Sequence, residues 1–253
     1  MNEAVEAGLW GLFGGSALLL GASIVYVAQL PQRVIAAVMA IGSGVLISTV
    51  AFDLMDDAYA RGGLDSTALG FLGGAAAYTV ANVLVSRAGG KHRKRSGSNA
   101  RESQASVASG AGLAIAIGAL LDGIPESVVI GVSLLEGSGV STAAVVAVFL
   151  SNVPEGLSSA AGMRSAGRRP AYVFGVWGAI TAASGLAALL GNVALAGADP
   201  DLIAATTAIA AGAILAMLVD TMIPEAAEET HELSGLITVG GFLLAFMLSK
   251  LGG

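Results

Sequence analysis

Residues 108–134 read ASGAGLAIAIGALLDGIPESVVIGVSL. This run is long enough to cross a bilayer, because a transmembrane helix takes about 20 mainly apolar residues. Its two acids, Asp122 and Glu126, fall near its middle at i,i+4 spacing, so they share one helix face. Charged side chains at membrane depth are costly and usually line a pathway or a site. The stretch therefore predicts a membrane helix with a functional polar face.

Seven further runs share this apolar character, which predicts an all-α membrane protein with one transmembrane domain over residues 1–253. The chain is 55% hydrophobic and 12% charged, whereas a soluble domain is about 25% charged. Its 36 glycines suit helices that approach closely in lipid. The absence of cysteine excludes disulfides and cysteine-based zinc sites. The eight predicted spans are 5–28, 34–59, 67–86, 108–134, 140–163, 170–196, 201–227 and 233–250.

The longest polar gap, residues 87–106, is rich in Gly, Ser and basic residues, which predicts a flexible loop. If the N-terminus is outside, ten Lys and Arg fall in inside loops and two fall outside. Cytoplasmic loops carry the excess of positive charge. We therefore predict a multi-pass protein of the cell membrane with both termini outside and the basic loop in the cytoplasm. The ten inside residues are Arg33, Arg87, Lys91, Arg93, Lys94, Arg95, Arg101, Arg164, Arg168 and Arg169; the outside ones are Arg61 and Lys250.

Three predicted helices contain a proline followed directly by a glutamate: Pro125-Glu126, Pro154-Glu155 and Pro224-Glu225. A proline inside a helix removes one hydrogen bond and frees the carbonyl four residues before it. In lipid such a carbonyl must face protein, water or a cation. A carboxylate beside a freed carbonyl is a ready oxygen-rich ligand set. The freed carbonyls belong to Leu121, Leu150 and Asp220.

The first two of these motifs fall near the predicted midplane, where transporter sites tend to lie. Their acids would repel one another, and a divalent cation offsets that repulsion while accepting oxygen ligands. The alternative is that the acids are protonated and serve helix packing. Neither His92 nor His231 falls in the predicted set, and an all-oxygen set favours manganese or iron more than a histidine site would, without excluding zinc. The predicted metal ligands are Asp122, Glu126, Ser151, Asn152 and Glu155.

Further acids mark a possible cation pathway on either side of the midplane. Asp53, Asp56 and Asp57 lie near the predicted outer end of the second span, where they could concentrate cations. Asp220 and Glu225 approach the cytoplasmic end of the seventh. For both groups the alternative is a solvated polar helix end.

With these motifs in view, the whole chain resembles the ZIP (Zrt/Irt-like protein) metal transporters. The resemblance is most specific at the Pro-Glu motifs of the fourth and fifth helices. It implies a two-metal centre between those helices, uptake toward the cytoplasm and frequent dimers. It also implies an eight-helix bundle with an inverted repeat of the first and last three helices. The matching residues are Asp122, Gly123, Pro125, Glu126 and Ser127, then Ser151, Asn152, Pro154, Glu155 and Gly156.

The chain departs from the family pattern at several ligand positions. Asp122 stands where the family usually has His, and Gly123 replaces an Asn ligand. Ser151 and Asn152 stand where His or Gln and an acid are common. In helix six the frequent Glu-Pro is absent, and the stretch offers Ser184-Gly185. The resemblance thus implies one site with the bridging pair Glu126 and Glu155, and a second site reduced mainly to Asn152.

These observations predict a divalent cation transporter rather than an enzyme, with zinc, manganese or iron as substrate. The expected partners are membrane lipid, the ions and, as the resemblance implies, a second copy of the chain in a homodimer; no nucleic-acid partner is expected. Two alternatives stay open: a proton-coupled carrier that uses the same acids as a relay, and a non-transporting protein of the same fold. The paired aspartates or His-Glu zinc motif of an intramembrane protease are not evident.

The orientation can be tested in this cysteine-free chain. Single cysteines placed in the 87–106 loop should react with a membrane-impermeant maleimide only when the cytoplasmic side is accessible, because the loop carries most of the inside charge. A cysteine beside Arg61 should react only from outside. Labelling with the opposite sidedness would overturn the predicted topology.

Overall fold

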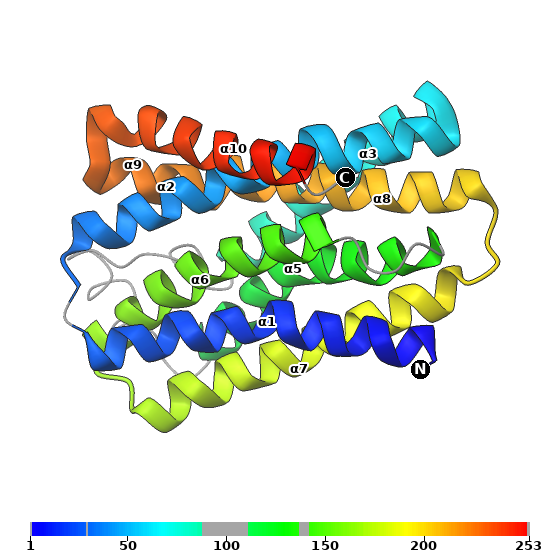
Figure 1. Cartoon of the computed structure of the whole chain (residues 1–253). Helices are drawn as coiled ribbons and strands as arrows, with labels where there is room; N and C mark the ends of the chain where they lie inside the picture. Colours follow the sequence, from blue (N-terminus) through cyan, green and yellow to red (C-terminus); the bar gives the residue numbers. More distant parts are fainter. Residues whose placement is uncertain (1, 29, 88–110, 137–141, 252–253) are drawn as a thin grey trace.

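The computed structural model describes residues 2–28, 30–87, 111–136 and 142–251, and the elements in these ranges are all helical (Figure 1). Most of the predicted 87–106 loop, with His92, lies outside the described residues. The principal helices are α1 (Glu3–Val27), α2 (Gln32–Thr49), α3 (Met55–Val85), α5 (Ala111–Ser133), α6 (Thr142–Ser165), α7 (Pro170–Leu195), α8 (Pro200–Met217), α9 (Ile223–Thr230) and α10 (Ser234–Leu251).

Five helical stretches of the described chain are long and apolar enough to cross a membrane. Three of them have ordinary lengths for one crossing. The other two, Gln32–Val85 and Pro200–Lys250, run for 54 and 51 residues. Several long apolar helices are compatible with a membrane-embedded protein; the predicted count of eight spans stays a prediction.

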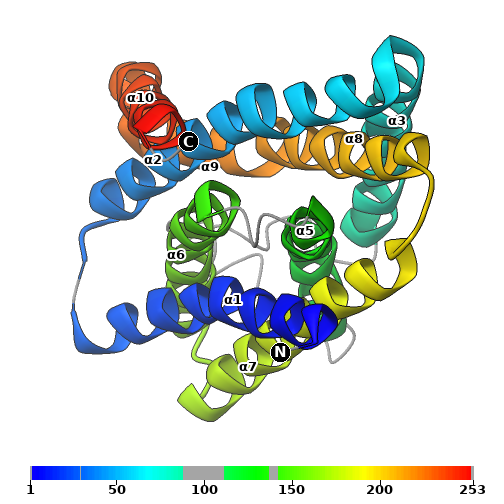
Figure 2. The same ribbon diagram turned by 45° about the vertical axis from the view of Figure 1, so that its right-hand side comes forward.

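Each of the two long stretches contains a backbone break where the sequence predicts a gap between two spans. In α3 the break is Gly63, with φ 66° and ψ −168°, a conformation that glycine adopts readily. Figure 2 shows α3 changing direction along its length. In the second stretch His231 has φ 48° and ends α9. The predicted gap at 60–66 is thus no loop but a one-residue break, because Gly63 alone supplies the turn.

Two π-helical turns interrupt the same long stretches, at Val50–Leu54 and Leu218–Met222. Each contains an aspartate, Asp53 in the first and Asp220 in the second. A π turn widens the helix by one residue and often marks a functional site. The second one ends two residues before Pro224, which cannot donate a backbone hydrogen bond.

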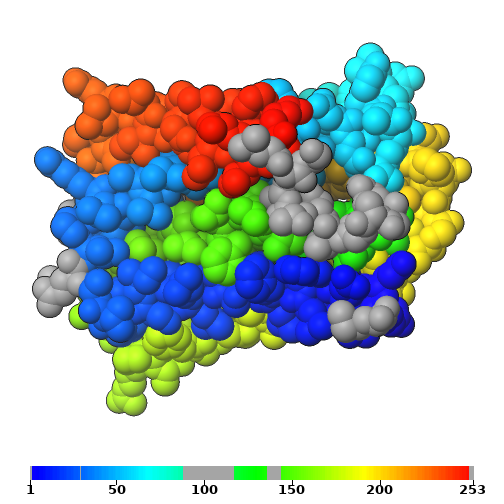
Figure 3. All heavy atoms as spheres, viewed as in Figure 1, coloured from blue at the N-terminus to red at the C-terminus, as the bar shows by residue number. Residues whose placement is uncertain are grey.

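Helices α5 and α6 lie in the middle of the bundle (Figure 2). On one side α1 packs along both α6 and α7, and α7 also packs on α5. On the other side α3 packs along α8, and α2 contacts α6 and α10. The two helices that carry the first two Pro-Glu motifs are therefore enclosed by helices from both halves of the chain. Part of α6 reaches the surface between α1 and α10 (Figure 3).

The bundle exposes many large apolar side chains and buries several carboxylates, a combination that is unusual in a water-soluble protein. Large apolar side chains such as Leu69, Leu72 and Leu236 are 67–74% exposed. Carboxylates including Asp122 and Glu126 are 1% exposed. Lipid accepts apolar side chains, whereas polar groups at membrane depth must find partners within the protein. This distribution fits a chain embedded in a bilayer.

Glycines let α3 and α8 approach until their backbones touch. A Cβ added to Gly74 would overlap the carbonyl oxygen of Ile209, and one added to Gly212 would overlap that of Phe71. The hydrophobic effect contributes little to association between helices in lipid. Small residues at such crossings instead stabilise the helix pair by allowing close van der Waals contact. The contact fixes the second half of α3 against α8.

Gly74→Ala should therefore lower the melting temperature of the protein in detergent, with an overpacking cost of about 1–3 kcal/mol. Gly73→Ala is the matched control, because a Cβ there meets nothing within 4 Å. Alanine favours the helix over glycine by up to about 1 kcal/mol, so the control should melt at the same or a higher temperature. Equal melting temperatures for the two variants would contradict the proposed backbone contact.

Candidate metal centre

The acids of the first two Pro-Glu motifs are buried in the centre of the bundle. Asp122 and Glu126 of α5 are each 1% exposed, and Glu155 of α6 is 4% exposed. Pro125 and Pro154 lie inside helices that continue past them, as the sequence predicts. The neutral members of the predicted ligand set, Ser151 and Asn152, are 2% and 3% exposed and belong to α6.

Glycine contacts between α1 and α6 set the position of the α6 motif. A Cβ on Gly156 would overlap the Leu18 carbonyl oxygen, and one on Gly21 would overlap the Val153 carbonyl oxygen. The two helices therefore touch backbone to backbone within one residue of Glu155. This explains physically why glycine follows the glutamate in this motif: any larger residue would push α1 away.

Asn152 uses this close approach to bind α1 through its amide group. Its Nδ2 donates to the carbonyl oxygen of Gly14 at 3.1 Å. Its Oδ1 is buried and has no hydrogen-bond partner among the described residues. Leaving a buried acceptor unsatisfied costs free energy, and a cation would satisfy it. The fixed amide thus presents an oxygen of the kind that hard divalent ions bind.

The serines of the motifs donate their hydroxyl hydrogen bonds to carbonyl groups of their own helices. Ser151 Oγ donates to the Val148 carbonyl at 3.0 Å, and Ser127 Oγ donates to that of Gly123 at 2.7 Å. A hydroxyl that donates in this way keeps lone pairs for a cation. Ser151 therefore remains chemically able to act as a ligand.

Tyr78 is a site residue that the sequence did not reveal. Its hydroxyl donates to Asp122 Oδ1 at 2.7 Å, and Tyr78 is only 2% exposed although it belongs to α3. The bond fixes the orientation of the Asp122 carboxylate from a helix 44 residues earlier. A tyrosine in an apolar run is an uninformative signal by itself, because tyrosines often occur at helix surfaces and interfaces.

Near the third Pro-Glu motif, Glu225 is buried and the preceding acid, Asp220, is exposed. Glu225 is 8% exposed and accepts a 2.5 Å hydrogen bond from Ser158 Oγ of α6. Asp220 is exposed and accepts a bond of 3.3 Å from Asn82 Nδ2. Ser158 follows Glu155 by three residues, so it lies on the same side of α6. Glu225 is thereby joined to the interior of the bundle, whereas Asp220 lies at its surface.

Gly123 and Ser184 face each other at the place where the sequence departs from the ZIP pattern. A Cβ on Gly123 would lie 3.7 Å from Ser184 Oγ, and Ser184 is 6% exposed in α7. Gly123 therefore borders a buried hydroxyl. His231, by contrast, is exposed at the end of α9.

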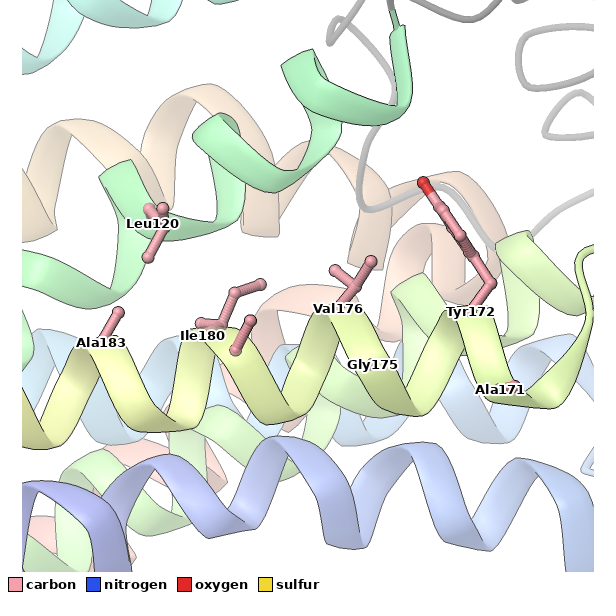
Figure 4. Close-up of a pocket in the computed structure, with 8 residues that line it drawn as sticks. Leu120, Ala171, Tyr172, Gly175, Val176, Ile180 and Ala183 are labelled. Carbon is pink, nitrogen blue, oxygen red and sulfur yellow. The ribbon is translucent and has the colours of Figure 1, made fainter.

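Within the part of the chain that the structure describes, no three Asp, Glu or His side chains are grouped closely enough to hold one metal ion. A centre at this place would combine carboxylates with neutral oxygens such as Asn152 Oδ1. A cavity of about 390 Å³ lies elsewhere: it is apolar, borders α7 and Leu120 of α5, and no acid lines it (Figure 4). It offers nothing to a cation.

Comparison with known proteins adds no assignment: no protein-family model and no curated protein matches this chain.

Tyr78→Phe should destabilise the protein by about 1–3 kcal/mol, because it leaves one oxygen of a buried carboxylate without its donor. The loss should shrink in an Asp122→Asn background, and thermal melting of the four proteins of this double-mutant cycle gives the coupling. Tyr59→Phe is the control, because Tyr59 is 59% exposed. An equal loss in both backgrounds would show that the hydroxyl acts elsewhere.

Proposed function

We propose that this chain is a ZIP-type transporter that carries divalent metal cations toward the cytoplasm. The substrate would bind between α5 and α6, held by oxygens of Asp122, Glu126, Ser151, Asn152 and Glu155. The observation that carries the proposal is the buried Asn152 Oδ1, which has no hydrogen-bond partner among the described residues and belongs to the same helix as the buried Glu155. An acceptor and an acid buried together favour a cation as the occupant.

The chemistry of the set favours hard or borderline divalent ions. All its donors are carboxylate, amide or hydroxyl oxygens, which suit manganese and magnesium, while zinc and ferrous iron accept carboxylates as well. With Asp122 in place of the family's histidine, we propose broad divalent specificity in which manganese and iron compete effectively with zinc. Metal affinity should fall at acid pH, because protons compete for the carboxylates.

The proposed path continues from Glu155 toward Glu225. Ser158 bonds Glu225 and lies one turn beyond Glu155 on α6. Ions leaving the centre would meet this second buried carboxylate on the side that the loop charges predict to be cytoplasmic. Asp220 would act at most at the surface, since it is exposed.

The same hydroxyl bonds give some support to a proton-coupled carrier. Tyr78 and Ser158 each donate to a buried acid, and chains of such groups can relay protons. A relay would need a pH gradient for activity and no metal. Metal uptake without a pH gradient separates the two functions.

Purified protein in liposomes should take up Mn²⁺, Fe²⁺ and Zn²⁺, and uptake should fall at least about tenfold in Glu126→Ala and in Glu155→Ala, because each removes a ligand. Both variants should remain folded, since removing a buried carboxylate also removes the cost of burying it. Glu232→Ala is the control, because Glu232 is exposed and outside the site. Normal uptake in either site variant would refute the assignment.

A further inference from the structure

A second polar cavity lies away from the proposed centre and contains two carboxylates. It has a volume of about 50 Å³ and is bordered by Asp53, Asp57, Ser133 and Thr207, with apolar residues forming the rest of its wall. Ser133 follows Glu126 by seven residues on α5, which is roughly 10 Å along a helix axis. The cavity is therefore separate from the Glu126 region. Its volume suffices for a cation with a water molecule.

Thr207 is the residue that indicates a ligand in this cavity. It is 4% exposed, and its Oγ1 has no hydrogen-bond partner among the described residues. Its neighbour Thr206 behaves normally for a helix and donates to the Leu202 carbonyl at 2.8 Å. Thr49 and Thr67 likewise donate to the carbonyl four residues earlier. Thr207 does not form this bond. Its hydroxyl therefore remains able to bind a ligand in the cavity that it borders.

The two acids of the cavity are held by different partners. Asp53 Oδ1 accepts from Ser249 Oγ of α10 at 2.7 Å. Asp57 Oδ1 accepts from Arg61 Nε at 2.7 Å in an i,i+4 ion pair. Asp53 and Asp57 are also i,i+4, so they share a helix face, whereas Asp56 is exposed and does not border the cavity.

Arg61 is a competitor for any cation in this cavity. Its guanidinium balances the Asp57 carboxylate, and a divalent ion that binds both acids would have to displace it. The other nearby base, Lys250, has its Nζ 5.9 Å from the centre of the Phe246 ring. Removing Arg61 should therefore strengthen cation binding, the opposite of what removing a ligand does.

We propose that this cavity binds one divalent cation through Asp53, Asp57, Thr207 and Ser133, in competition with the Arg61 guanidinium. The oxygen donors suit a hard ion such as Mn²⁺. A role for this cavity as a binding site at the outer end of a transport path rests on the proposed function, but the binding of a cation does not. The site divides the three acids that the sequence groups together: Asp53 and Asp57 bind the ion, and Asp56 contributes only long-range charge.

The test uses the full chain in detergent with Glu126→Gln and Glu155→Gln, which remove the proposed centre. Free Mn²⁺ is measured by electron paramagnetic resonance during titration. One Mn²⁺ should bind per chain. Asp53→Asn should abolish this binding, and Thr207→Val should weaken it by about tenfold. Arg61→Gln should tighten it several-fold. Asp56→Asn is the matched control and should change the affinity less than about twofold, since exposed charges are screened.

The outcomes are distinguishable from those for the proposed function. Absence of Mn²⁺ binding in the double-glutamine background would overturn the site, even if the wild type transports metal. Mn²⁺ binding in the double-glutamine background, without metal uptake by the wild type, would refute the proposed transport function and support the cation site. Equal losses of Mn²⁺ affinity in Asp53→Asn and Asp56→Asn would show that the binding depends on overall negative charge and not on a ligand at Asp53. Thr207→Ser should restore the affinity lost in Thr207→Val; failure to do so would exclude the hydroxyl as a ligand.

Discussion

The backbone contact between α1 and α6 is the interaction on which the central acids depend. Gly21 and Gly156 allow the two helices to touch, because a Cβ at either position would overlap a carbonyl of the other helix. The contact brings Gly14 within reach of Asn152 Nδ2, which fixes the amide and directs its oxygen into the interior. Glu155 directly precedes Gly156, so its position depends on the packing of α6 against α1. In lipid, where apolar surfaces gain little by association, such close contact supplies much of the stability.

Hydroxyl groups from distant helices donate hydrogen bonds to the carboxylates of this bundle and so offset part of the free-energy cost of removing them from water. Tyr78 donates to Asp122, Ser158 to Glu225 and Ser249 to Asp53, each across a helix interface. A neutral donor satisfies a carboxylate oxygen without cancelling its charge. The acids are thus held in place by neutral hydroxyl donors from other helices.

Breaks in helical regularity occur where the acids occur. Pro125 and Pro154 interrupt the hydrogen bonding of α5 and α6 beside Glu126 and Glu155. The π turns Val50–Leu54 and Leu218–Met222 carry Asp53 and Asp220. Each irregularity leaves backbone groups with altered bonding at membrane depth, which is tolerated where they face protein or a polar cavity. The irregular turns and the acids therefore coincide along the chain, although Asp53 is half-buried and Asp220 is exposed.

The sequence by itself determined the helical class, the presence of long apolar helices and the burial of Asp122, Glu126 and Glu155, because these follow from local hydropathy and from the cost of exposing charge to an apolar environment. The sequence groups Asp220 with Glu225, whereas the structure exposes the first and buries the second. Only the tertiary structure decided which hydroxyls meet which acids. Tyr78 and Asp122 are 44 residues apart, and Thr207 reaches the Asp53 cavity from another long stretch. Such pairs depend on where helix backbones cross, and glycine contacts between distant segments fix those crossings without leaving a local pattern.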